Sequence, residues 1–209
     1  MNIFLKIYYV YFSKFGFIYN KINLLISYLL NFKEIKSRNE LYLNEISKIK
    51  NNKIDKIVSK LNTDGYYFTN LKEFNINFDI SKKIKSLDTV PGNKSKKKFF
   101  TNLYEFRKND DLSTFAINKY FIKLISKYLK LSPIINNIQL IKSDIINDKQ
   151  FYSSMNWHID NHHDKLIKIM LLPFDLDIQG GPTCFLDKKT SEYIIKKNFY
   201  FKSPRYFSD

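Results

Sequence analysis

Residues 157–186 read WHIDNHHDKLIKIMLLPFDLDIQGGPTCFL, and this stretch decides which fold the sequence predicts. Its residues 166–172 are an apolar run that ends at Pro173, a pattern typical of a buried strand. Glycines at 180 and 181 followed by Pro182 then indicate a turn, and residues 183–186 begin a second strand. We expect the two strands to pair in an antiparallel sheet, with the glycines in their connection.

All three histidines of the chain lie in this stretch, at His158, His162 and His163. His158 and Asp160 are two positions apart, and on a strand such residues project from the same face. One imidazole and one carboxylate make two thirds of the facial triad that holds non-haem Fe(II) and leaves coordination positions open. The motif is short and occurs often by chance, so the pair also has a plainer interpretation, as two structural residues joined by a hydrogen bond.

The neighbouring polar residues have plainer interpretations as well. We expect His162 and His163 to be solvent-facing loop residues. A zinc site built from the three histidines and Asp160 is an alternative, but it would be crowded, whereas structural zinc prefers separated pairs of ligands. Lys168 is expected to be a solvated strand lysine, with contact to a cosubstrate carboxylate as the alternative. Cys184 is the only cysteine, which excludes an intrachain disulfide, and we expect it to be a small core residue.

Upstream of this stretch the spacing of apolar residues is helical. Residues 54–61 predict a helix that ends at Gly65, which can adopt a positive φ. Residues 113–130 predict a second helix, capped by Ser113. Short strands are expected at residues 66–69 and 138–142, and residues 88–98 predict an exposed loop. Helices therefore precede strands, which indicates the α+β class. The predicted apolar face of the second helix consists of Ile117, Phe121, Leu124, Ile125 and Tyr128.

The order of these elements resembles the phytanoyl-CoA dioxygenase family of Fe(II)/2-oxoglutarate-dependent oxygenases. That family shows a Trp-His-x-Asp element, a lysine-containing apolar strand, an acidic turn and a Gly-Pro turn. The matching residues here are Trp157 to Asp160, Lys168, Asp175 to Asp177, and Gly180 to Pro182. The resemblance covers residues 54–209, as a partial oxygenase domain, and leaves residues 1–53 as a helical N-terminal extension.

The resemblance implies a jelly roll, the double-stranded β-helix, with the N-terminal helices packed on it. It also implies hydroxylation of a small organic or lipid-like substrate, with Fe(II) held by His158, Asp160 and a later histidine, and with 2-oxoglutarate as cosubstrate. No histidine follows His163, and Arg205 lies in a segment that precedes the family's third ligand. We therefore expect a C-terminally truncated chain that lacks the last strands of the roll and is inactive and poorly soluble.

Charge and hydropathy leave a second class of function open. The formal net charge is +15, but the chain has only three arginines, and arginine is the side chain that binds phosphate in two places, so we expect no specific nucleic-acid partner. Residues 1–32 are rich in aromatic and aliphatic side chains but contain no apolar run long enough to span a bilayer. They predict either a helix that packs on its own domain or an interfacial helix with weak membrane-surface contact.

We expect a cytoplasmic protein whose partner is a small-molecule substrate. The competing hypothesis is a non-catalytic, basic binding protein or a membrane-proximal protein, which keeps the fold and has lost the metal site.

Overall fold

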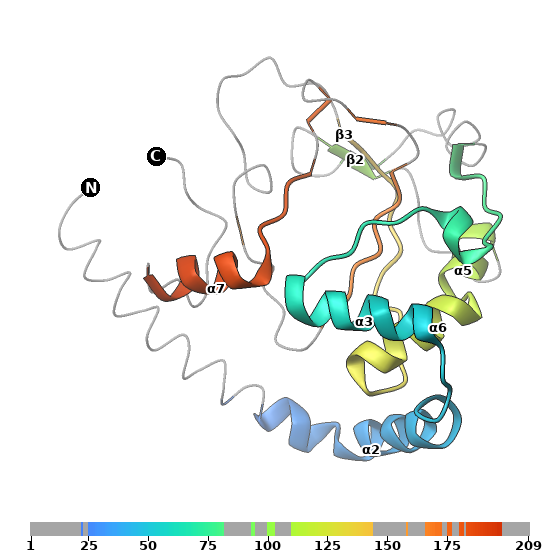
Figure 1. Ribbon diagram of the computed structural model, residues 1–209, viewed down its shortest axis with the longest axis vertical. Coiled ribbons are helices and arrows are strands. Elements are labelled where there is room, and N and C mark those ends of the chain that lie inside the picture. Colours follow the sequence, from blue (N-terminus) through green and yellow to red (C-terminus); the bar gives the residue numbers. More distant parts are fainter. Residues whose placement is uncertain are drawn as a thin grey trace.

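The computed structural model describes residues 22, 25–81, 93–94, 100–102, 110–143, 158, 166–172, 175–176, 180–181 and 183–197. Helices dominate these ranges (Figure 1). In chain order the elements are α2 (Phe32–Leu41), the π-helix η1 (Tyr42–Ile46), α3 (Asn52–Asp64), the 3-10 helix η2 (Leu71–Phe74), β1 (Asn93–Lys94), β2 (Phe100–Asn102), α5 (Asp111–Ala116), α6 (Lys119–Leu129), β3 (Ile141–Ser143) and α7 (Lys188–Lys197).

The strands of the described part form one small antiparallel sheet in the order β1-β2-β3. Its register pairs Asn93 with Asn102 in one ladder and Phe100 with Ser143 in the other. With two or three residues in each strand, the sheet cannot form either layer of a jelly roll. The predicted α+β fold with an incomplete double-stranded β-helix is therefore wrong for the described residues, whose architecture is mainly helical.

The two strands expected at residues 166–172 and 183–186 have no regular secondary structure, and the strand expected at 66–69 is also irregular. A strand is stable only when a neighbouring strand accepts its backbone hydrogen bonds and a facing layer covers its apolar side chains. The second condition is not met in the described part of the chain, since Ile169 and Leu172 are 45% and 57% exposed. Of the expected strands, only residues 138–142 overlap an observed one, β3 (Ile141–Ser143).

The buried core lies where α3 crosses α6. Ile54 and Ile57 of α3 are 1% and 2% exposed, and they form one cluster with Leu124 of α6. The partly buried residues packed against this cluster are Val58, Leu61, Tyr67, Phe74 and Tyr120. The helical spacing at residues 54–61 thus predicted the core face of α3 correctly.

An ion pair also joins the two helices. Lys127 of α6 donates a hydrogen bond to the Asp55 carboxylate of α3, and the Lys127 side chain is only 13% exposed. This hydrogen bond is the main cause that lowers the pKa of Asp55 below its ordinary value. The pair contributes stability above the unfolded pKa of the carboxyl, and the contribution is lost as the pH falls through the folded pKa.

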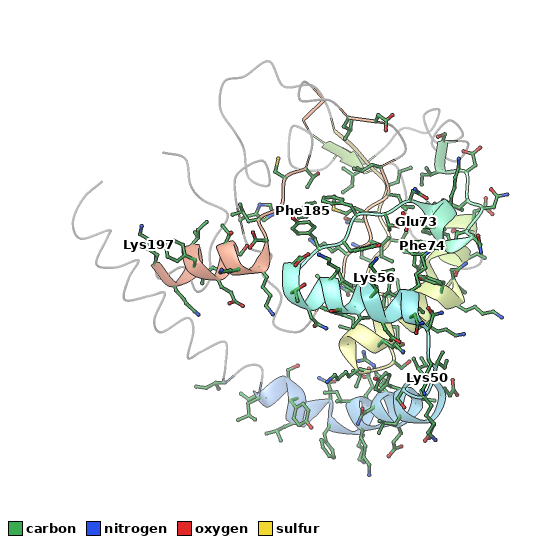
Figure 2. All side chains as sticks on the ribbon, in the orientation of Figure 1. Lys50, Lys56, Glu73, Phe74, Phe185 and Lys197 are labelled. Carbon is green, nitrogen blue, oxygen red and sulfur yellow. The ribbon has the colours of Figure 1, made fainter. Side chains whose placement is uncertain are left out.

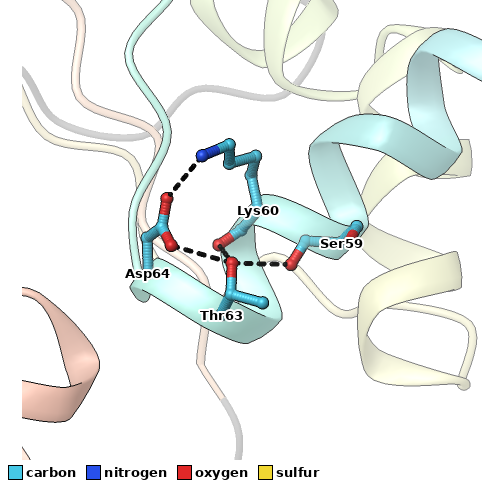
Figure 3. Close-up of polar contacts among 4 residues, drawn as sticks. All are labelled: Ser59, Lys60, Thr63 and Asp64. Carbon is cyan, nitrogen blue, oxygen red and sulfur yellow. Dashed lines mark hydrogen bonds and ion pairs between the residues drawn. The ribbon is translucent and has the colours of Figure 1, made fainter.

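The C-terminal end of α3 is held by local polar contacts (Figure 3). The Thr63 hydroxyl lies 3.2 Å from the Ser59 carbonyl oxygen and 2.8 Å from a carboxylate oxygen of Asp64, whose other oxygen accepts a hydrogen bond from Lys60 at 3.1 Å. The hydrogen bonds from Thr63 and Lys60 lower the pKa of Asp64. Gly65 ends the helix with φ at 86°, as the sequence predicted, because this left-handed conformation costs a glycine little.

The helix predicted over residues 113–130 is in fact two helices, α5 and α6. Asp110 caps α5 by accepting a hydrogen bond from the Ser113 backbone N–H at 2.8 Å, and Asn118 caps α6 by accepting one from the Tyr120 N–H at 2.9 Å. Asn118 interrupts the helix because its short amide side chain competes for backbone donors. The predicted cap at Ser113 is wrong, and Ile117 at the junction is 59% exposed and not part of the buried face.

Helix α7 was not expected, because the last third of the chain was predicted to contain strands. Asp187 caps it, accepting hydrogen bonds from the Thr190 N–H at 2.7 Å and the Thr190 hydroxyl at 3.0 Å, and these bonds lower the pKa of Asp187. Lys188 donates to the Asn62 carbonyl at 3.1 Å, which ties α7 to the end of α3. None of the described helices has the length and apolar character needed to cross a bilayer.

Ser126 provides a test of the packing between α6 and its neighbours. Its side chain is 0% exposed, and its hydroxyl has no hydrogen-bond partner within the described part of the chain. Replacing Ser126 with alanine should raise the free energy of unfolding by about 1 kcal/mol, because it removes an unsatisfied buried hydroxyl and improves helix propensity. Urea denaturation of the two proteins measures the difference, with the exposed Ser59→Ala in α3 as the matched control. A loss of stability in the Ser126 variant would show that the hydroxyl is paired.

Candidate functional site

Of the two expected metal ligands, the structure describes His158 and not Asp160. His158 is half-buried and lies outside any helix or strand. Trp157, Asp160, His162 and His163 lie outside the described residues, so the convergence expected for His158 and Asp160 stays a prediction. A half-buried imidazole is compatible with a ligand role, since its ring is partly withdrawn from water.

The segment after the histidines is non-helical and solvent-exposed. Residues 166–172 carry Lys168 on the surface, as predicted for a solvated lysine, although the segment is not a strand. Gly181 has φ at 68°, a conformation suited to the turn predicted at residues 180–182, of which Pro182 lies outside the described part. Cys184 is exposed, so its prediction as a core residue is wrong.

Three aromatic rings bring the segment before α7 against the chain that leaves α3. The ring centroids of Tyr66 and Phe68 are 5.3 Å apart, and those of Tyr66 and Phe185 are 6.0 Å apart. Figure 2 shows Phe185 beside the C-terminal end of α3. These contacts place Phe185 against the chain that leaves α3, although Phe68 and Phe185 remain 70% and 46% exposed.

The described residues contain no group of three histidine, cysteine, aspartate or glutamate side chains that could hold a metal ion. The sequence pattern places His158 two positions from Asp160, which lies outside the described residues. Their chemistry, one imidazole nitrogen and one carboxylate oxygen, is the chemistry that non-haem Fe(II) sites use.

A cavity of about 310 Å³ lies where the N-terminal ends of α3 and α6 meet. Asn51, Asn118, Lys119 and Lys123 contribute polar groups to its wall, and Phe74 contributes an aromatic face. The two asparagines already cap their helices, so the backbone donors at these ends are used within the fold. Sequence reasoning missed the cavity, although an asparagine before each helical run is a recognisable start signal.

Tyr120 lines the same cavity and is the described residue whose phenol is most perturbed. Its ring stacks on Phe74 with centroids 4.6 Å apart, and its hydroxyl is buried with no hydrogen-bond partner among the described residues. Burial, with smaller contributions from Tyr67 and Glu73, raises the pKa of Tyr120 above its ordinary value. The phenol is therefore protonated at neutral pH and serves as part of the core.

No protein-family model matches this chain, and no curated protein or solved structure matches it either. The resemblance to the oxygenase family accordingly rests on the residues of the 157–186 stretch and on their order.

Proposed function

We propose that the segment around His158 and Asp160 is the metal-binding element of a non-haem Fe(II)/2-oxoglutarate-dependent oxygenase. The observation that carries the proposal is the ordered pattern Trp157-His158-Ile159-Asp160, an apolar segment with Lys168, and the Gly180-Gly181-Pro182 turn. The proposed reaction class is hydroxylation of a small organic or lipid-like substrate.

Two features of the described residues support this proposal. His158 is half-buried and non-helical, and Gly181 has the positive φ that a tight turn requires. The proposal does not depend on a jelly roll, because the i, i+2 spacing brings an imidazole and a carboxylate to one face of any short segment with β-strand geometry.

The two side chains would have separate tasks at the metal. His158 would supply a neutral imidazole nitrogen, and Asp160 a carboxylate oxygen whose charge offsets part of the charge of the cation. Bound Fe(II) with 2-oxoglutarate would supply the oxygen-activating chemistry, while the protein sets ligand geometry and limits water access. The proposal names no residue of this chain as the third ligand.

Fe(II) affinity tests the assignment. Removing a direct ligand should weaken binding at least as much as removing a residue that only orients a ligand, which commonly costs about 10- to 100-fold. His158→Ala and Asp160→Ala should each therefore lower the Fe(II) affinity of the 209-residue chain by at least about tenfold. Anaerobic equilibrium dialysis of wild type and variants measures the change.

His162→Ala and His163→Ala are the matched controls, because they remove the same side chain only a few positions away. They should bind Fe(II) as the unchanged chain does. Equal losses of Fe(II) affinity in all four variants would indicate that the metal binds to several side chains of this segment without a defined ligand set. An unchanged affinity in His158→Ala would refute the proposed ligand set.

A further inference from the structure

The helical stretch over residues 25–41, which is interrupted at Asn31 before α2 begins, touches the rest of the protein with one face. Along this helix and η1, the half-buried and buried residues are Ser27, Ile35, Arg38, Tyr42 and Ile46, whose spacing follows a single helical face. Arg38 fixes the orientation of that face. Its Nε donates to the Ser132 carbonyl at 2.7 Å, and the Ser132 N–H donates to the Arg38 carbonyl at 3.1 Å.

The N-terminal part of the same helix has its apolar residues exposed. Of residues 22 and 25–32, every residue except Ser27 is exposed. Backbone hydrogen bonds from Asn31 to Ser27 at 3.0 Å and from Ile35 to Asn31 at 2.9 Å carry the helix through to α2 (Figure 1). The exposed apolar side chains, here called the apolar stripe, are Ile22 (50%), Leu25 (59%), Ile26 (47%), Leu29 (63%), Leu30 (81%) and Phe32 (48%).

The orientation of apolar and polar side chains here is the reverse of that in a helix that covers a core. A surface helix of a globular protein turns its apolar residues inward and its polar residues outward. Here the residue turned inward is Ser27, and the leucines and isoleucines face solvent. A contiguous apolar patch of this kind marks a surface that meets an apolar partner.

Charge and aromatic content favour a membrane surface as that partner. Lys33 and Lys36 follow the apolar stripe and are exposed, with the Lys36 ammonium 4.0 Å from the Glu40 carboxylate. The whole chain has a formal net charge of +15, which favours anionic headgroups. Tyr28 and Phe32 pack edge to face with centroids 5.9 Å apart, and tyrosine side chains are enriched at the headgroup level. A helix with one apolar face and lysines beside it binds a membrane by lying in the plane of the interface.

We propose that the apolar stripe docks this protein on an anionic lipid bilayer, with the helix lying in the interface. In the docked state Leu25, Leu29 and Leu30 would enter the boundary between headgroups and acyl chains, while Lys33 and Lys36 would contact lipid phosphates. The Arg38–Ser132 contacts would hold the rest of the protein on the water side.

Vesicle co-sedimentation of the full 209-residue chain tests the proposal. The chain should bind phosphatidylcholine vesicles that contain phosphatidylserine more tightly than vesicles of phosphatidylcholine alone, and added salt should weaken the difference. The double variant Leu25→Gln with Leu29→Gln should lower the affinity by at least about tenfold, because two large apolar side chains leave the membrane. Glutamine preserves helix propensity, so the helix should remain folded, which far-UV circular dichroism checks.

The matched control is Ile134→Gln with Ile135→Gln, which removes two exposed isoleucines (59% and 40%) outside the stripe and should bind as wild type does. Equal loss of binding in the control, or equal binding to both kinds of vesicle, would overturn the proposal. So would a lipid-free dimer, seen by analytical ultracentrifugation, that the Leu25/Leu29 variant dissociates, because the stripe would then be an interface between copies of the chain.

Discussion

Replacing Phe121 with alanine is expected to lower the free energy of unfolding by about 3–5 kcal/mol, the usual cost of removing a large aromatic side chain from a core. Phe121 is 3% exposed, and its ring packs edge to face with Phe115 at 5.1 Å and with Phe74 at 6.3 Å. It therefore joins α6 to α5 and to η2. Removing the ring would leave a cavity that three separate elements must fill at once.

Guanidinium denaturation of Phe121→Ala and wild type measures this effect. Phe68→Ala is the matched control, because the same ring is removed from a position that is 70% exposed. The control should change stability by less than about 1 kcal/mol. If both variants lost the same stability, or neither lost any, the contacts around Phe121 would not be the core of the protein.

Replacing Ile54 with alanine should cost about 2–5 kcal/mol, because the side chain is buried between α3 and α6. Ile54 is 1% exposed and packs in one cluster with Ile57 and Leu124. The deleted atoms lose their contacts with both helices, and the backbone of two packed helices cannot close the gap. The result is a lower midpoint of chemical denaturation and a lower melting temperature.

Ile117→Ala provides the comparison for Ile54→Ala. Ile117 is 59% exposed at the junction between α5 and α6, so the same deletion should have little effect there. A large loss in Ile117→Ala would favour the continuous helix over residues 113–130 that the sequence pattern alone predicts. A small loss in Ile54→Ala would contradict the core between α3 and α6.

Helix α3 could be predicted because its signals are local. Its apolar residues follow helical spacing, Asn51 precedes the first turn, and Gly65 follows the last. Each signal acts within a few residues of its effect, so no knowledge of the rest of the fold is needed. The break between α5 and α6 was equally local. Asn118 is a strong N-cap residue, and giving it that weight would have divided the predicted helix correctly.

The strands could not be predicted in the same way. Residues 166–172 have the composition of a buried strand, but a strand also needs a partner that supplies hydrogen bonds and a layer that covers it. Those partners are distant in sequence, and composition does not show whether they exist. Helix α7 was not predicted for a related reason. Because a sheet was expected to continue through this part of the chain, the N-cap at Asp187 and the helical residues that follow it were not recognised.

For the candidate site, the sequence could predict which kinds of side chain would bind a metal, but not how they are arranged in space. The spacing of His158 and Asp160 indicates which donors are close together, but the third ligand of a facial triad comes from a distant part of a chain, so local spacing cannot identify it. The apolar residues before α2 were likewise visible in the sequence. Which way they face depends on the contact between Arg38 and Ser132, 94 residues apart.

Absorption spectroscopy of the Co(II)-loaded chain tests the central claim most directly, because the intensity of the visible bands reports the coordination geometry of the metal. Nitrogen and oxygen ligands with open positions, as in an oxygenase site, should give weak bands, whereas a tetrahedral zinc-type site should give intense ones. Unbound Co(II) also gives weak bands and is also chelated by 2-oxoglutarate, so it is first removed by dialysis. The proposed ligand set then predicts Co(II) that stays with the protein and has weak bands that change when 2-oxoglutarate is added. These bands should be lost in His158→Ala and Asp160→Ala and retained in His162→Ala and His163→Ala. Intense bands that do not change when 2-oxoglutarate is added, and that disappear in His162→Ala or His163→Ala, would contradict the assignment.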